Sequence, residues 1–423
     1  MPPLGRTAWL EIDLDAIVAN LTAIRSLVGP TVRVEPVVKA DAYGHGLVPV
    51  AQALEGAGAD GFAVATWDEA VVLRRSGVKA PILVLYPVPP EHAAEAARRG
   101  ITLTAGDPTL LRRLLDRLVT AARADGSPGS RADPLAIELE IETGLGRGGF
   151  AAHDLAAAAA AIGATPGARL EGAWSHLQAP ADEPRSAAQG ARFAAALRAL
   201  GDAGEVVVRR HLAASGALLV GDGPPCEAVR PGLAIYGLIP DELDGHPAGE
   251  RLALRPAMAL RARPVRVLDL PAGWGISYGP TFVTSRPTRV ATLPLGYGDG
   301  WPRSLSNRAE ALVRGVRVPL IGTVAMDAVM ADVTDVPGAP VGVDDEFTLI
   351  GDDGEARITA GELARSRTTI SWEVVTNMPR RLARVYHAAS GPTGVRALGD
   401  GETAWLGSSS GTATSATSRS TRS

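Results

Sequence analysis

One lysine follows an apolar segment and precedes a tyrosine, a histidine and two glycines. The segment covers residues 32–38, and Lys39, Tyr43 and His45 come after it. Lysine and arginine number 42 together, yet Lys39 and Lys79 are the only lysines. Arginine can replace a surface cation but cannot form a Schiff base, whereas a desolvated lysine can. Lys39 is therefore a candidate for Schiff-base chemistry, and a structural lysine at a strand end is the alternative.

Three carboxylates alternate with apolar residues over 135–142. Side chains in a strand alternate between two faces, so Glu138, Glu140 and Glu142 share one face. In a closed barrel the apolar face meets the helices and the carboxylates point into the lumen, where buried acids need cationic partners. An edge strand with one solvated face is the alternative.

Eight strand-like segments must position these residues. They cover residues 32–39, 61–66, 81–86, 101–105, 135–142, 170–177, 206–213 and 228–234. Helical spacing lies between most of them and is clearest over 107–124 and 185–201; it also covers 14–28. This alternation predicts an α/β fold, a (β/α)8 TIM barrel, with a doubly wound open sheet as the competitor.

Polar residues at the ends of these segments favour the barrel. Each of them lies at or just past the C-terminal end of a different predicted strand. They are Lys39, Arg147, His176, Ser215 and Arg230. TIM-barrel enzymes collect their catalytic groups at that end of the barrel.

The second half of the chain has a different predicted secondary-structure pattern, with short strands and Gly/Pro turns. These strands are expected at 257–269, 289–294, 311–313, 318–324 and 347–351, with a helix at 359–365. The pattern predicts a barrel over 1–244 and a β-rich domain over 245–390, with which the first strand, 8–13, is able to pack. A surface insertion is expected at 126–134 and a disordered tail at 407–423.

Composition excludes several classes of protein. The formal net charge of -4 gives no basic surface for nucleic acid or an anionic membrane. The single cysteine, Cys226, excludes an intrachain disulfide and a zinc–cysteine cluster, and no metal site is expected. Acidic residues at 11, 13 and 15 interrupt the N-terminal segment, so it is no signal peptide, and no apolar segment reaches membrane-spanning length. A cytoplasmic protein is expected.

Seven motifs occur in one order along the chain. They lie at residues 37–46, 142–147, 175–176, 229–237, 277–279, 295–300 and 326–327. Together they resemble alanine racemase, a fold-type III enzyme that uses pyridoxal 5'-phosphate. The resemblance covers most of residues 8–386.

The resemblance implies that Lys39 carries pyridoxal 5'-phosphate through a Schiff base. The residues expected to hold its phosphate are Tyr43, Ser215, Gly232 and Leu233, with Tyr386 closing the site. Hydroxyl and backbone N–H groups suit a phosphate dianion, and glycine permits close approach. From the residues alone, Gly232 could be a turn glycine and Ser215 a helix N-cap.

By the same resemblance Arg230 faces the pyridine nitrogen. Arginine cannot accept the ring proton, so the ring stays neutral and stabilises a carbanion less, which limits side reactions. Fold-type III decarboxylases use an acid there, so Arg230 favours racemisation. A structural ion pair with a lumen glutamate is the alternative for this arginine.

Racemisation needs bases on opposite faces of Cα, and the resemblance assigns them to Lys39 and Tyr278. A tyrosine needs nearby positive charge to act as a phenolate, which a chain Tyr278–His176–Arg230 would supply. A satisfied core histidine and an ordinary turn tyrosine are the alternatives for His176 and Tyr278.

The resemblance also implies a head-to-tail homodimer with shared active sites. Tyr278 and Met326 reach the other subunit's site, where the Met326 N–H meets the substrate carboxylate. Arg147 supports that carboxylate, and Tyr297 lines the entrance. Glu140 stands where relatives usually carry a carbamylated lysine, and we expect it to accept hydrogen bonds from Arg147.

The leading hypothesis is an alanine racemase that supplies D-alanine for cell-wall peptidoglycan. A racemase for a broader range of small amino acids is an alternative, because Arg380 falls where several relatives carry a tyrosine near the substrate. A non-catalytic pyridoxal-phosphate-binding protein is a third hypothesis, which the presence of Tyr278 and Met326 disfavours.

Overall fold

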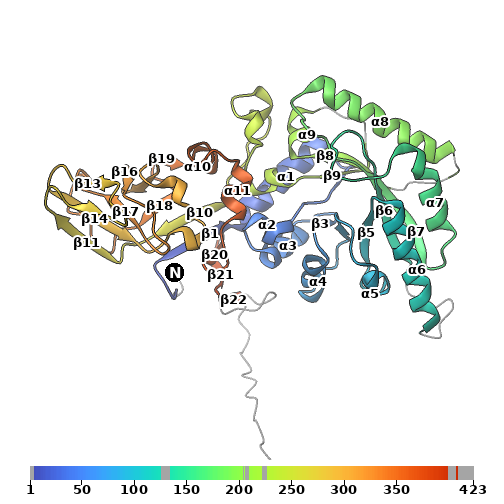
Figure 1. The fold of residues 1–423 in the computed structure, drawn as a ribbon, viewed down its shortest axis with the longest axis horizontal. Helices are drawn as coiled ribbons and strands as arrows, with labels where there is room; N and C mark the ends of the chain where they lie inside the picture. Colours follow the sequence, from blue (N-terminus) through green and yellow to red (C-terminus); the bar gives the residue numbers. More distant parts are fainter. Residues whose placement is uncertain are drawn as a thin grey trace, which may run out of the picture.

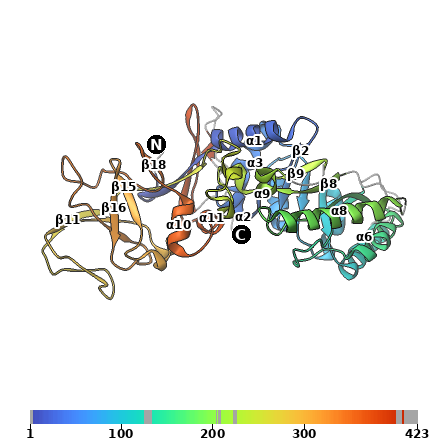
Figure 2. The same ribbon diagram turned by 90° about the horizontal axis from the view of Figure 1, so that it is seen from above.

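The computed structural model describes residues 4–124, 134–202, 204, 209–221, 226–398 and 406–407. They form an α/β part and a mostly β part, which lie side by side in Figures 1 and 2. The predicted insertion at 126–134 and tail at 407–423 lie outside the described residues, except for their first or last residue.

Eight parallel strands form the sheet of the α/β part. They are β2 (Arg33–Val34), β3 (Phe62–Val64), β4 (Ile82–Val84), β5 (Ile101–Ala105), β6 (Leu135–Glu140), β7 (Ala168–Trp174), β8 (Arg209–Ala214) and β9 (Ala228–Arg230). Their order is β2-β9-β8-β7-β6-β5-β4-β3. A parallel bridge between Val37 and Ala63 joins the two outer strands, and the Val38 N–H donates to the Ala63 carbonyl at 2.9 Å. The sheet is therefore the expected barrel and not an open sheet.

Helices surround the barrel strands (Figure 1). They are α1 (Leu14–Val28), α2 (Lys39–Tyr43), α3 (Leu47–Gly56), α4 (Trp67–Arg75), α5 (Ala93–Arg99), α6 (Pro108–Ala124), α7 (Leu155–Gly163), α8 (Glu183–Asp202) and α9 (Ser215–Val220). Helix α1 begins at the N-cap Asp13, whose side chain accepts from the Ala16 N–H. It precedes the barrel in sequence but packs beyond the last strand, where Asn20 donates to the Ile235 carbonyl at 3.0 Å.

A second sheet of twelve strands forms the β part. It contains β1 (Ala8–Asp13), β10 (Met258–Ala262), β11 (Arg266–Leu270), β14 (Thr288–Leu293), β15 (Glu310–Val313), β16 (Val316–Ile321), β17 (Val329–Asp332), β18 (Phe347–Asp353), β19 (Ala356–Ile358), β20 (Ala383–Ala388), β21 (Gly391–Arg396) and β22 (Leu406–Gly407). A separate hairpin pairs β12 (Gly275–Ile276) with β13 (Phe282–Val283). Helices α10 (Ala360–Arg367) and α11 (Ser371–Thr376) complete this part.

Strand β1 connects the two parts. It pairs antiparallel with β10 and parallel with β20, so the start of the chain lies inside the second sheet. Helix α11 approaches the barrel at α2, near the centre of Figure 2. The domain boundary near residue 244 stays a prediction; it falls between the end of β9 and the start of β10.

Several predicted strands are shorter in the structure, and two of them bear on the site. The segment 228–234 leaves the sheet after Arg230, because Pro231 has no N–H to donate, and residues Leu233–Tyr236 form a 3-10 turn. The segment 32–39 pairs regularly only over Arg33–Val34. Lys39 follows the Val38 contact directly, so it does lie at the end of this barrel segment.

Candidate active site

The turn after Lys39 has an unusual backbone. Four consecutive residues, Ala40 to Tyr43, have left-handed φ angles of 51–55°. This conformation costs roughly 1–2 kcal/mol per non-glycine residue, so other contacts must hold it. The Asp41 carboxylate supplies one such contact, because it accepts from the Leu47 N–H at 2.9 Å.

Two arginines of the second sheet stabilise the same turn. Arg396 donates to Asp41 at 2.8 Å, and Arg384 donates to the Gly44 carbonyl at 2.8 Å. Burial alone would raise the pKa of Asp41, but Arg396 and Arg384 outweigh it and lower that pKa. A Cβ at Gly44 would overlap the Val375 carbonyl of α11, so only glycine fits there. The β part thus holds the turn that follows Lys39.

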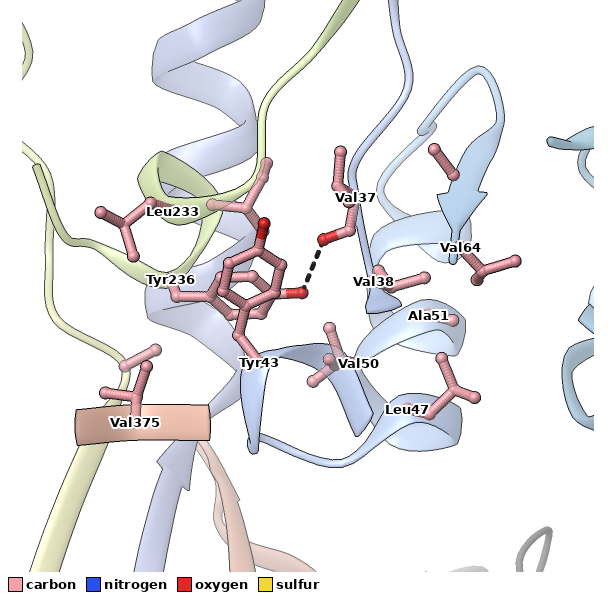
Figure 3. Packing of buried hydrophobic residues seen from close by; sticks show 14 of the residues in the cluster. Val37, Val38, Tyr43, Leu47, Val50, Ala51, Val64, Leu233, Tyr236 and Val375 are labelled. Carbon is pink, nitrogen blue, oxygen red and sulfur yellow. Dashed lines mark hydrogen bonds between the residues drawn. The ribbon is translucent and has the colours of Figure 1, made fainter. Parts of the chain in front are cut away.

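This turn places the Tyr43 ring in a buried stack (Figure 3). The rings of Tyr43 and Tyr236 lie 4.9 Å apart between centroids, and the Tyr236 hydroxyl donates to the Val37 carbonyl at 3.0 Å. Burial raises the pKa of Tyr43 to about 12, so it keeps its proton. A Cβ on Gly232 would lie 2.6 Å from the Tyr43 hydroxyl oxygen, so that oxygen lies close to the Gly232 backbone.

A pocket of about 390 Å³ opens at the C-terminal ends of the barrel strands. It brings together eight of the residues expected from sequence: Lys39, Tyr43, Arg147, His176, Ser215, Arg230, Gly232 and Leu233. Trp372 and Thr376 of α11 also line it. Tyr386 does not line this pocket. It lies beneath the turn, with its hydroxyl oxygen so close to Gly46 that a Cβ on that residue would overlap it.

Ser215 organises one end of the pocket. Its hydroxyl oxygen accepts from the Gly232 N–H at 3.0 Å and from the Ala234 N–H at 3.1 Å. Because the oxygen accepts both bonds, its own proton is available to donate. The Ser215 and Tyr43 hydroxyls and the glycine backbone therefore make a concave, polar end that suits a phosphate group.

The cations of the pocket affect one another. Burial lowers the pKa of Lys39, and Arg147 and Arg230 lower it further, while Glu69 opposes them. Burial also lowers the pKa of His176 to about 3, with Arg230, Arg147 and Lys39 contributing. His176 is therefore neutral, and Lys39 loses its proton more readily than an exposed lysine.

The predicted chain from Tyr278 through His176 to Arg230 stays a prediction, although the described residues show no hydrogen bond between His176 and Arg230. Within the described residues the hydrogen bonds of Arg230 go to the His211 ring and carbonyl and to the Ser175 carbonyl, at 2.8 Å for the last. Strand β8 brings the His211 ring into the lumen beside β9, so this histidine takes the position next to the guanidinium. His176 still lines the same pocket as Arg230.

The predicted lumen acids have cationic or backbone partners. Glu138 is 0% exposed and contacts Arg209 and His211. Glu142 accepts from the Gly146 N–H at 2.8 Å and so holds the turn that carries Arg147. These contacts confirm that the glutamate face of β6 points into the barrel.

The predicted contact of Glu140 with Arg147 is present. Arg147 Nη2 donates to Glu140 at 3.2 Å. Burial raises the pKa of Glu140, although Arg147 opposes this. The Arg147 guanidinium also lies 5.6 Å from the Tyr86 ring centroid. Two groups therefore fix the arginine at the edge of the pocket.

The remaining predicted residues lie on the β part, away from this pocket. Tyr278, Met326 and Tyr297 are 76%, 52% and 42% exposed. Tyr278 sits on a fixed turn, because the preceding Ser277 has a φ of 64° and donates to the Thr323 carbonyl at 2.6 Å. A single chain does not bring Tyr278 to Lys39.

The described part of the chain contains no group of three or more His, Cys, Asp or Glu side chains placed to hold a metal ion. Among its helices, none combines the length and the hydropathy that a membrane crossing requires.

The sequence matches two family models, the alanine racemase N-terminal domain over residues 12–240 and the alanine racemase C-terminal domain over residues 257–386. The chain belongs to the alanine racemase family. Alanine racemase 2 of Caldanaerobacter subterraneus subsp. tengcongensis is 40% identical over 385 residues, covering 90% of this chain and 95% of the relative. Alanine racemase of Desulfosudis oleivorans is 39% identical over 392 residues, with 90% and 96% covered.

Solved alanine racemase structures agree with this fold. The enzyme from Bacillus anthracis with bound L-Ala-P superposes with a TM-score of 0.85 at 34% identity, covering 93% of this chain and 98% of that one. The enzyme from Streptomyces coelicolor gives 0.79 at 33% identity, with 90% and 98% covered.

His211 and Arg209 were not predicted from the sequence as site residues of this alanine racemase family member. A weak signal was available, because both residues lie on the strand that leads to Ser215. His211 and Arg209 are two apart, so they share a strand face, and three glutamates on β6 called for cationic partners.

Proposed function

We propose that this protein interconverts L-alanine and D-alanine with pyridoxal 5'-phosphate attached at Lys39, and so supplies D-alanine for cell-wall peptidoglycan. The observation that carries the proposal is one pocket in which a desolvated lysine faces Arg147 and Arg230 beside the Ser215 hydroxyl. A carbonyl-bearing phosphate cofactor requires this combination of amine and anion-binding groups.

The residues present fit the cofactor. The Tyr43 and Ser215 hydroxyls and the backbone at Leu233, next to Gly232, would hold its phosphate, and Lys39 would hold its carbonyl carbon. The chemistry that the cofactor supplies when bound is withdrawal of electrons from Cα of the amino acid. Arg230 donates hydrogen bonds only, so it would take no proton from a ring nitrogen that it faced and would keep its own positive charge.

Two bases move the Cα proton in this proposal. In the L-to-D direction the Tyr278 phenolate takes the proton from one face. The Lys39 ammonium, free once the substrate amine has taken its place, delivers a proton to the opposite face. The D-to-L direction exchanges these roles. Because Tyr278 is exposed on the β part of its own chain, we infer that it enters the pocket of a second copy, and that the active unit is a homodimer.

Arg147 would bind the substrate carboxylate, with the Met326 N–H of the second subunit as another donor and Tyr297 at the entrance. Glu140 fixes Arg147 from behind. Tyr386 would act indirectly in this scheme, by packing under the turn that presents Tyr43.

Racemisation by the purified protein tests the proposal. L-alanine, L-serine, L-lysine and L-aspartate are each incubated with protein and pyridoxal 5'-phosphate, and the D-enantiomer is measured by chiral chromatography. We expect the highest kcat/KM with L-alanine. An equal kcat/KM for the substrates with larger side chains would favour the broader racemase over an alanine-specific enzyme. No racemisation of any substrate would overturn the proposal.

A further inference from the structure

A buried chain of charged and polar contacts extends from Arg230 through the barrel lumen. Arg230 contacts His211, His211 contacts Glu138, Glu138 contacts Arg209, and Arg209 contacts Glu35. All five residues are at most 6% exposed. They come from β9, β8, β6 and the segment that follows β2, so this series of contacts extends across the barrel lumen.

The chemistry of the groups determines where the His211 proton lies. A carboxylate only accepts hydrogen bonds, and a guanidinium only donates them. His211 Nε2 lies 2.6 Å from Glu138 Oε2, so Nε2 must carry the proton. Nδ1 faces the Arg230 guanidinium and must offer its lone pair. Burial lowers the pKa of His211 below its ordinary value although Glu138 opposes this, so the ring is neutral and has a single proton.

The other carboxylate oxygen of Glu138 is also hydrogen-bonded. Arg209 Nε donates to Glu138 Oε1 at 2.7 Å, and Arg209 Nη1 donates to Glu35 at 2.9 Å. Glu35 also accepts from Arg33 Nε at 3.1 Å. Glu138 therefore uses one oxygen for Arg209 and the other for His211.

The His211 lone pair is one of the acceptors that surround the Arg230 guanidinium. The guanidinium donates to His211 Nδ1, to the His211 carbonyl at 3.1 Å and to the Ser175 carbonyl at 2.8 Å. It also lies 4.9 Å from the Trp174 ring centroid. Within the described residues these bonds use three of its five N–H groups, so two remain for a ligand in the pocket that Arg230 lines. With a proton on His211 Nδ1, that N–H and an Arg230 N–H would face each other, and neither would have an acceptor.

We propose that Glu138 is a positioning residue: it fixes the Nε2–H tautomer of His211, which in turn aims the Arg230 guanidinium into the pocket. Arg209 and Glu35 keep Glu138 in place. The inference rests on the proposed function only in what Arg230 then faces, the ring nitrogen of the cofactor.

Glu138→Gln isolates this role. An amide has one accepting oxygen, whereas Glu138 uses two. Arg209 offers two N–H groups and a charge, so it retains the oxygen, and the amide NH2 turns to His211 Nε2. The histidine must then move its proton to Nδ1, against Arg230. Glu171→Gln on β7 is the matched control, since Glu171 pairs with Arg169 and, within the described residues, makes no hydrogen bond or ion pair with His211 or Arg230.

The direct measurement is ¹⁵N NMR of histidine-labelled full-length protein, with the His211 signals assigned by comparison with His211→Asn. Wild type and Glu171→Gln should show His211 as the Nε2–H tautomer, and Glu138→Gln should show it wholly or partly as Nδ1–H. The wild-type spectrum alone decides the matter if Glu138→Gln does not fold. A wild-type Nδ1–H tautomer, or an unchanged tautomer in Glu138→Gln, would overturn the proposal.

Kinetics and absorbance supply the second measurement. In Glu138→Gln we expect kcat for alanine to fall roughly tenfold to hundredfold, the effect typical of removing an outer-shell partner of a functional histidine, with KM nearly unchanged. The absorption band of the bound cofactor should shift as well. The tautomer is measured without turnover. An inactive wild type with the Nε2–H tautomer would therefore contradict the proposed racemase activity but not this inference. An active wild type with the Nδ1–H tautomer would contradict this inference but not the racemase activity.

Discussion

Asp41 and Arg396 are 355 positions apart in sequence and form a two-point ion pair, with Arg396 Nη1 at 2.8 and 3.0 Å from the two carboxylate oxygens. The pair joins the last long strand of the second sheet to the left-handed turn that follows Lys39. It is largely buried, since the side chains are 7% and 19% exposed. The β part therefore shapes the pocket beside Lys39 although it lies outside the barrel.

Breaking this pair should loosen the turn. Arg396→Gln removes charge-assisted hydrogen bonds of about 1.5–3 kcal/mol in a partly strained segment. We expect a lower urea midpoint and faster loss of pyridoxal 5'-phosphate on dialysis. Arg357→Gln, which breaks an exposed pair with Asp352, is the control and should change neither by much. Equal behaviour of the two variants would show that the ion pair does not hold the turn.

The sequence predicted the barrel because its signals are local. Alternation of apolar and helical segments, and polar residues at strand ends, follow from the period of each element. The lumen position of Glu138 followed from a period of two along β6. These features need only neighbouring residues to be read.

The rest of the site depends on contacts between distant segments. Alanine, aspartate and tyrosine carry no strong preference for left-handed backbone, so the turn at Ala40 to Tyr43 had no signal. It exists because Arg384 and Arg396 hold it from the other end of the chain. His211 was missed for the same reason, since its neighbour Arg230 lies on another strand.

Lysine mapping tests the attachment site. Borohydride reduction of the protein with pyridoxal 5'-phosphate should label Lys39 and leave Lys79 unlabelled. Lys39 is desolvated in the pocket, whereas Lys79 is exposed and resembles any surface lysine. Lys79→Ala should therefore retain the label and Lys39→Ala should lose it. Labelling at Lys79, or at neither residue, would refute covalent attachment at Lys39.

Glu140 is expected to support the substrate carboxylate through Arg147. Glu140→Gln should raise KM for alanine about three- to tenfold and leave kcat nearly unchanged, because Arg147 is 36% exposed and solvent screens part of the interaction. Steady-state kinetics measure this, with Glu171→Gln as the control. An unchanged KM would mean that Glu140 serves only the packing of the barrel.

Glu138 should make the fold sensitive to acid. Burial would raise its pKa, but His211 and Arg209 outweigh it and lower the pKa to about 2, from an ordinary value of 4.5. A lowered folded-state pKa gives stability that is present above the ordinary pKa and is lost as pH falls toward the folded value. The free energy of unfolding of wild type should therefore fall more steeply between pH 4.5 and 2 than that of Glu138→Gln. Urea titrations at a series of pH values measure it, and parallel curves would contradict the assignment.

The sharing of one active site by two subunits is tested most directly by complementation. Tyr278→Phe should lose roughly 10²-fold in rate, the contribution of one general base, without a change in urea midpoint because the residue is exposed. Lys39→Ala should be inactive. A hybrid dimer of the two variants carries one site with both bases and one with neither. After subunit exchange in an equal mixture, racemisation should therefore recover to about one quarter of the wild-type rate, as two-fold symmetry requires. No recovery after mass spectrometry has verified exchange would contradict a racemase built from Lys39 of one subunit and Tyr278 of the other.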